Sequence, residues 1–117
     1  MNELTLWQIE SLAVANGIEF LSFSSEEEAT QYYLTQLTEL VRKVMLCYLG
    51  SLTLIELNSF VRCECGIKIN KNKKVTISQA LLYIEGDIEF WTKSIFKIDG
   101  FSFFKQSFLD KVGIKTI

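Results

Sequence analysis

Residues 26 to 49 form the longest stretch of the chain in which apolar positions keep a helical period. Ser25 is a suitable N-cap, Glu28 completes a capping-box pattern with it, and Gly50 is a suitable C-terminal stop. The apolar residues recur at steps of three and four, so one face of this helix is expected to be buried. They are Ala29, Tyr33, Leu37, Leu40, Val41, Val44 and Tyr48. The pattern predicts a long central helix (about 26–49) around which the other elements are arranged.

Shorter helices are expected on both sides of this element. Each is suggested by a capping residue, by apolar periodicity or by a glycine at its end. The expected helices are 3–16 between the cap Asn2 and Gly17, 54–65 after Thr53, 79–85 after the cap Ser78, 88–98, and a last one marked by Phe104, Phe108, Leu109 and Val112 and closed by Gly113.

Two of these stretches also alternate like strands. From Val61 to Ile69 every second residue is apolar or cysteine, which is typical of one face of a strand, whereas the preceding residues follow a helical spacing. We favour a helix that ends at Gly66. Residues 88–98 show the same ambiguity, and there too we favour a helix.

Strands are expected in two other places. Residues 18–23 alternate and predict a short strand. Residues 67–69 and 75–77 predict the two arms of a small β-hairpin (about 66–77), joined by the polar loop 70–74. No repeat or linker divides the chain. The expected fold is therefore α+β, a single compact domain over 1–117 that is mainly helical.

Composition limits the class of protein. A chain of 117 residues with 49% hydrophobic residues is long enough to bury a core, and its three cysteines make a disulfide framework unexpected. No stretch resembles a signal peptide or a membrane span, so a soluble, cytoplasmic protein is expected. Residues 1–30 hold six glutamates and no lysine or arginine, which gives −6 in a chain of net charge −2. The remainder then carries +4, and the two charges are either segregated or intermingled by the fold.

No catalytic constellation stands out. Histidine, the commonest general base and metal ligand, does not occur in the chain. Ser102 and Lys105 match an S-x-x-K pattern without its companion motifs, and the carboxylates of 85–89 flank what reads as a solvated turn. Cys63 and Cys65 point apart if they lie on a helix, so they are expected to be small packing residues. We therefore expect no enzyme activity, no cofactor and no metal site.

Two groups of residues suggest binding instead. Lys68, Lys71, Lys73 and Lys74 form a basic cluster on the expected hairpin, and solvated loop lysines are the ordinary explanation for it. Phe103 is expected to project from the polar side of the last helix, where an aromatic residue is either covered by another element or anchors a partner.

These features favour a small protein that binds another protein and blocks it by occlusion. The concrete expectation is an immunity-protein-like inhibitor, or antitoxin, of bacterial or phage type, whose partner is a toxin, a nuclease or another enzyme. Its expected partner-binding residues are Glu19, Glu26, Glu27, Glu28 and Phe103. The alternative is a nucleic-acid-associated regulator that uses the lysine cluster. Neither the oligomeric state nor the identity of the partner follows from the sequence.

Overall fold

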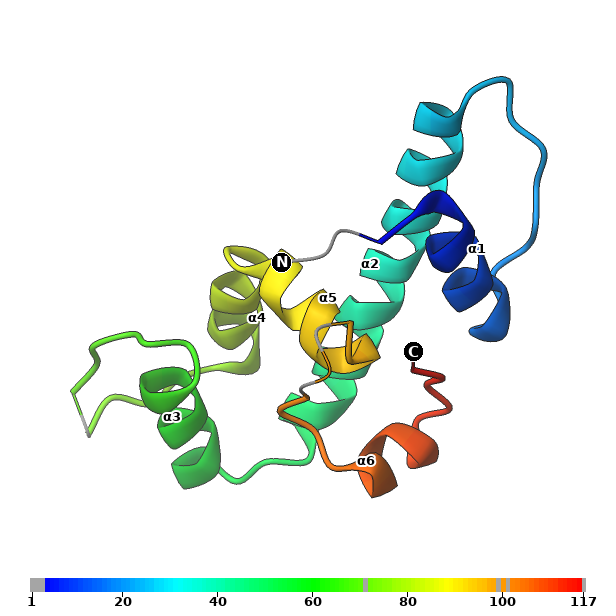
Figure 1. Ribbon diagram of the computed structural model, residues 1–117. Helices are drawn as coiled ribbons and strands as arrows, with labels where there is room; N and C mark the ends of the chain where they lie inside the picture. Colours follow the sequence, from blue (N-terminus) through cyan, green and yellow to red (C-terminus); the bar gives the residue numbers. More distant parts are fainter. Residues whose placement is uncertain (1–3, 71, 99, 101, 117) are drawn as a thin grey trace. The chain divides into compact units, whose positions relative to one another are not determined.

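The computed structural model describes residues 4–70, 72–98, 100 and 102–116 of the chain. All regular structure in these residues is helical, in the six helices of Figure 1, and they contain no strand. The expected α+β class is therefore wrong. The helices are α1 (Leu6–Ala15), α2 (Glu26–Gly50), α3 (Leu54–Cys63), α4 (Ile77–Glu85), α5 (Ile88–Phe96) and α6 (Gln106–Lys111).

The chain divides into two compact units, 1–41 with 89–117, and 42–88. The first unit contains α1, the N-terminal part of α2, α5 from Glu89 onward, and α6. Buried apolar side chains from all of these elements form its core. They are Ile9, Leu12, Ala13, Ala29, Tyr33, Leu37, Val41, Trp91, Ile95, Phe96, Phe104, Leu109 and Ile114. The expectation of a single domain over 1–117 stays a prediction.

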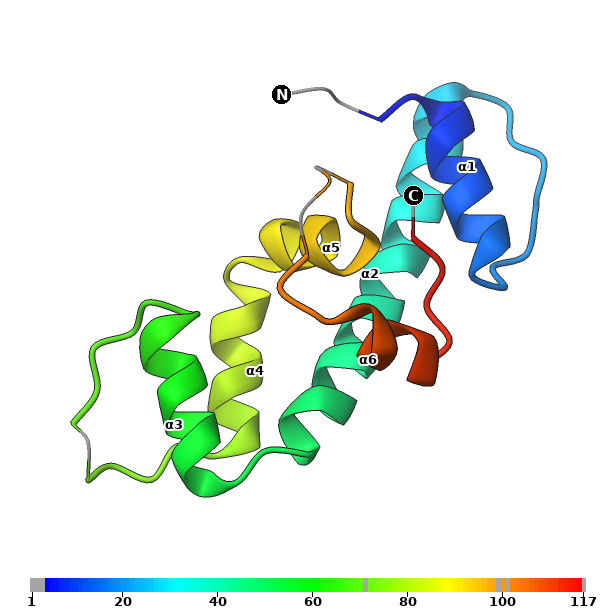
Figure 2. The same cartoon turned by 60° about the horizontal axis from the view of Figure 1, so that its bottom comes forward.

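The second unit contains the C-terminal part of α2 together with α3 and α4. Figures 1 and 2 both show α3 and α4 side by side, and these two helices contact one another. The ring of Tyr48 meets that of Phe60 edge to face at 5.6 Å. The buried apolar residues of this unit are Val44, Met45, Leu49, Leu57, Phe60, Val61, Val75, Ala80 and Ile84.

The long central helix is confirmed, and so is its cap. The Glu28 N–H donates to Ser25 Oγ at 3.2 Å, which satisfies one of the free donors at the start of α2. The Glu28 carboxylate accepts from the Ser24 hydroxyl at 2.9 Å, and no hydrogen bond from the Ser25 N–H to it occurs among the described residues, so the reciprocal half of the expected capping box is not formed. The helical interpretations of 54–65 and 88–98 are also confirmed, by α3 and α5.

Two other helices start at residues other than the expected ones. Thr5 caps α1 in a capping box with Gln8, and the expected start at Asn2 and Glu3 lies outside the described residues. Thr76 caps α4 in a capping box with Gln79, two residues before the expected cap Ser78. In both cases a threonine stands three residues before a glutamine, so the side chain of each can satisfy the backbone N–H of the other.

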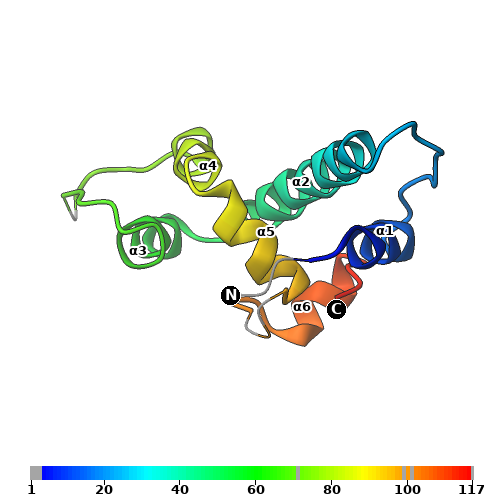
Figure 3. The same cartoon turned by 45° about the horizontal axis from the view of Figure 1, so that its top comes forward.

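The expected strand at 18–23 is wrong because the part of the chain that the structure describes holds no second strand for it to join. The backbone N–H and C=O of Leu21 are instead both satisfied by the hydroxyl of Tyr33, at 3.2 and 3.1 Å. Figure 3 shows this segment as a thread that runs outside α1 and the start of α2. A side chain of α2 therefore makes the hydrogen bonds to the Leu21 backbone that a neighbouring strand would otherwise make.

The expected hairpin at 66–77 is wrong for a different reason. The capping box of Thr76 starts α4 at Ile77, so the last residue of the expected second arm belongs to a helix and the one before it is the helix cap. An isolated two-stranded hairpin is marginal in water, so a competing helix start decides the outcome. The connection instead contains a turn in which Lys73 N–H donates to the Asn70 carbonyl at 2.9 Å, and Asn58 of α3 donates to the Lys73 carbonyl at 2.8 Å.

The two units carry opposite charge. Ten acidic and five basic residues give the first unit −5, and four acidic and seven basic residues give the second +3. The fold therefore keeps the acidic and the basic parts of the sequence in separate units. The first unit therefore attracts positive charge and the second unit negative charge.

Candidate functional site: an acidic concavity beside aromatic rings

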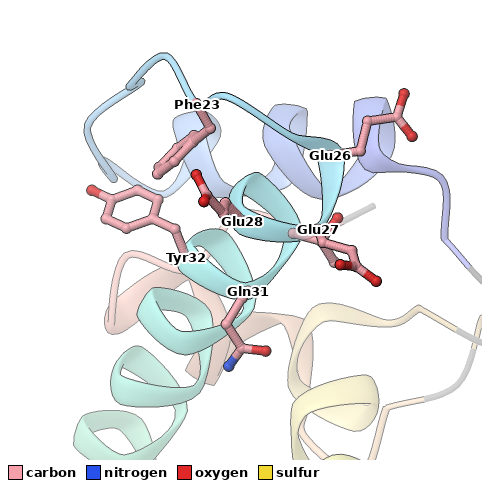
Figure 4. Close-up of a pocket in the computed structure, with 7 residues that line it drawn as sticks. Phe23, Glu26, Glu27, Glu28, Gln31 and Tyr32 are labelled. Atoms are coloured by element: carbon pink, nitrogen blue, oxygen red, sulfur yellow. The ribbon is translucent and has the colours of Figure 1, made fainter.

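The start of α2 borders an open concavity of about 920 Å³ in the first unit (Figure 4). Three of the expected partner-binding residues, Glu26, Glu27 and Glu28, line it. The remaining lining residues are Phe23, Thr30, Gln31 and Tyr32. The site therefore combines carboxylates with two aromatic rings, and all of them come from α2 and the segment that leads into it.

The three carboxylates do not converge. Consecutive residues of a helix are about 100° apart around its axis. In Figure 4 the Glu28 carboxylate lies beside the aromatic rings, while those of Glu26 and Glu27 point away from them. No group of three or more potential metal ligands occurs among the described residues. Such a surface suits several separated positive charges better than one ion.

The aromatic side of the site is a packed cluster. The ring of Phe23 lies 5.1 Å from that of Tyr32 and 5.9 Å from that of Tyr33, and the two tyrosine rings meet edge to face at 5.0 Å. Tyr33 is fully buried, whereas Tyr32 and Phe23 are partly exposed. The structure also brings Glu19 to this cluster, because the Tyr32 hydroxyl approaches the Glu19 carbonyl at 3.5 Å and the Glu19 side chain is exposed. Four of the five expected partner-binding residues thus lie in one region.

A second concavity, of about 370 Å³, adjoins the first. Leu6 and Glu10 of α1 line one side of it, residues 20–26 line another, and Ala29 of α2 contributes as well. The two concavities share Phe23 and Glu26. Together they border residues 20–26 and form a longer concave surface than either does alone.

Phe103, the fifth expected residue, lies elsewhere in the first unit. The last helix begins at Gln106, so the expectation that Phe103 projects from its polar side is wrong. Phe103 is half-buried, its N–H donates to Ser94 Oγ at 2.9 Å, and its ring meets those of Trp91 and Phe104 at 5.8 and 5.1 Å. These contacts make it part of an aromatic core cluster.

The basic cluster lies in the second unit. Lys68, Lys73 and Lys74 are exposed in the connection between α3 and α4, and Lys71 lies outside the described residues. The Asn70 side chain accepts from the Asn72 N–H at 3.0 Å, which orders part of this connection. No aromatic ring contact involves these lysines or their immediate neighbours among the described residues.

The cysteines and the carboxylates of residues 85–89, which were the other candidates for chemistry, make ordinary structural contacts. Cys63 is exposed at the end of α3, while burial, with smaller effects from Glu64 and Asp87, raises the pKa of the Cys65 thiol to about 11. A thiol with so high a pKa is a poor nucleophile at neutral pH. Glu85 accepts from Arg42 at 2.9 and 2.5 Å, and Glu89 pairs with Lys93 at 3.3 Å.

Sequence reasoning missed the aromatic half of the site. Phe20, which lines the second concavity, is 62% exposed. The one available signal was the Tyr32–Tyr33 pair, one turn after three glutamates. Only Tyr33 of this pair is expected on the buried face of the long helix, and it is buried there, whereas the partly exposed Tyr32 received no expectation.

Comparisons with protein-family models, with curated proteins and with solved structures found no match to this chain. Among the residues that the structure describes, no helix has both the length and the apolar character needed to cross a membrane.

Proposed function

We propose that the chain is a small inhibitory or neutralising protein that binds another protein through the acidic concavity and blocks it by occlusion, in the manner of an immunity protein. The observation that carries the proposal is the concavity itself, which Glu26, Glu27 and Glu28 line together with the partly exposed rings of Phe23 and Tyr32. Carboxylates attract and orient a basic partner, and aromatic rings supply the apolar contact area. A basic surface is typical of proteins that act on nucleic acid, so a nuclease toxin is the partner class we favour.

Charge segregation supports this choice of partner. The first unit carries −5, and its residues 1–41 include no lysine or arginine. Long-range attraction to a cationic protein accelerates association and weakens as salt is added. An inhibitor that must capture a toxin quickly benefits from such steering.

The test compares two variants with equal loss of charge. Glu26→Gln with Glu27→Gln removes two carboxylates from the concavity and spares Glu28, whose side chain holds Ser24. Glu64→Gln with Asp87→Asn removes two exposed carboxylates from the second unit. Each immobilised protein captures partners from lysate of the source organism at low and high salt, and any captured enzyme is assayed free and in complex.

We expect one stoichiometric protein partner whose activity is lost in the complex. Its affinity should fall about tenfold or more for the Glu26/Glu27 variant, because close interfacial charge pairs contribute at least this much, and should hardly change for the control. Equal binding by both variants, or a partner that stays active when bound, would refute the proposal. Capture of nucleic acid alone, lost after neutralising Lys68, Lys73 and Lys74, would replace it with the nucleic-acid alternative.

A further inference from the structure

A single side chain holds the backbone of Leu21 from one side. The Tyr33 hydroxyl donates to the Leu21 carbonyl oxygen at 3.1 Å and accepts from the Leu21 N–H at 3.2 Å. In a helix the N–H and C=O of one residue point in opposite directions along the axis, whereas in an extended chain they point to the same side. Leu21 is therefore extended, and Tyr33 occupies the place that a neighbouring strand would take.

Two adjacent backbone groups point the other way. All described peptide bonds are trans, and in a planar trans peptide the C=O and N–H point in opposite directions. The Phe20 carbonyl and the Ser22 N–H are thus directed away from Tyr33. No hydrogen bond among the described residues uses either group, and both residues are exposed. The two groups are an acceptor and a donor, two residues apart on the same side of the extended segment. A strand uses this arrangement to pair with another strand.

The Phe20 carbonyl and the Ser22 N–H form a backbone edge, and the side chains around this edge determine which segments it can bind. The two concavities border residues 20–26, and their carboxylates are those of Glu10, Glu26, Glu27 and Glu28. Phe20 is 62% exposed and supplies apolar contact area at the edge itself. Charge complementarity therefore selects an extended segment that carries positive side chains.

We propose that residues 18–23 are a docking edge for an extended, lysine- or arginine-bearing segment of the partner polypeptide. The segment pairs with the Phe20 carbonyl and the Ser22 N–H and places its basic side chains over Glu19, Glu26 and Glu27. Main-chain hydrogen bonds supply affinity in this mode, and alternate side chains supply specificity. This inference depends on the proposed function and gives the binding mode of the same site.

The test uses a nine-residue peptide of alternating lysine and valine and the same peptide N-methylated at every internal amide. N-methylation keeps charge and side chains but removes the N–H donors. Ser22→Pro removes the outward N–H on the protein side while Leu21, extended already, tolerates a following proline. Ser22→Ala keeps the N–H and is the matched control. Calorimetry gives each Kd, and amide exchange by NMR follows Ser22 and Leu21.

We expect about tenfold weaker binding after N-methylation and for Ser22→Pro, with no change for Ser22→Ala, because the lost main-chain hydrogen bonds carry the affinity. Bound peptide should slow exchange of the Ser22 amide and leave that of Leu21 unchanged. Equal affinity of the two peptides, or no detectable binding of the unmodified one, would overturn the docking edge. If Glu26→Gln with Glu27→Gln still weakens binding while N-methylation has no effect, the acidic site stands and only the strand mode fails.

Discussion

Replacing Tyr33 by phenylalanine tests the contact on which both the fold of residues 18–23 and the proposed docking edge depend. The ring of Tyr33 is fully buried, so phenylalanine keeps its packing and removes only the hydroxyl. Both hydrogen bonds to Leu21 are lost with it. Tyr32→Phe is the matched control, because its neighbouring hydroxyl makes only a long contact of 3.5 Å to the Glu19 carbonyl.

The expected loss follows from the two bonds. A typical intramolecular hydrogen bond contributes a net of about 0.5–1.5 kcal/mol to stability. Leu21 is 37% exposed, so water replaces part of what Tyr33 supplies. We therefore expect Tyr33→Phe to lower the free energy of unfolding by about 1–2 kcal/mol, and Tyr32→Phe by less than about 0.5 kcal/mol.

Urea denaturation followed by circular dichroism measures both values, and an unchanged m-value shows that the unfolded states are comparable. Hydrogen exchange of the Leu21 amide adds a local measurement, since protection should fall in Tyr33→Phe and persist in Tyr32→Phe. Equal stability losses in the two variants would refute the reasoning. The Tyr33 hydroxyl would then not be what holds the segment extended.

Three further predictions concern other parts of the chain. Lys97 has a positive φ of 55° after α5, a conformation that costs a residue with a Cβ atom more than it costs glycine. We therefore expect Lys97→Gly to stabilise the protein by about 0.5–1 kcal/mol in thermal unfolding. Lys97→Ala is the control and should not stabilise it, because alanine loses the 2.7 Å contact to Gln106 without relieving the strain. With its pKa near 11 instead of the ordinary 9.0, Cys65 should be alkylated about tenfold more slowly at pH 8 in the native protein than in urea, and equal rates would contradict its burial. The hydrogen bonds from Arg42 lower the pKa of Glu85, so their contribution is present above the ordinary pKa and is lost as pH falls through the lowered one. Glu85→Gln should therefore cost about 0.5 kcal/mol at pH 7 and nothing at pH 2, and a loss that persists at pH 2 would rule out the ion pair as its cause.

The parts of the fold that the sequence predicted are those decided within a few residues. The period of three and four identified α2, and Ser25 and Gly50 marked its ends, because a helix satisfies its own backbone and its caps are adjacent in the chain. The grouping of Glu26, Glu27 and Glu28 followed for the same reason, since they are consecutive and lie in the first turn of that helix. The segregation of charge between the two units was left open and needed the fold.

Only the tertiary structure decided what satisfies the extended backbone of residues 18–23. Side chains alternate in the same way in a paired strand and in an unpaired extended segment. The pattern therefore did not reveal that Tyr33, twelve residues after Leu21, replaces the second strand. Phe103 shows the same limit, because its N–H is bound by Ser94 of α5 and its ring by Trp91. Helices and caps depend on neighbours in sequence, whereas the partner of an extended segment depends on which side chain the packed helices bring to it.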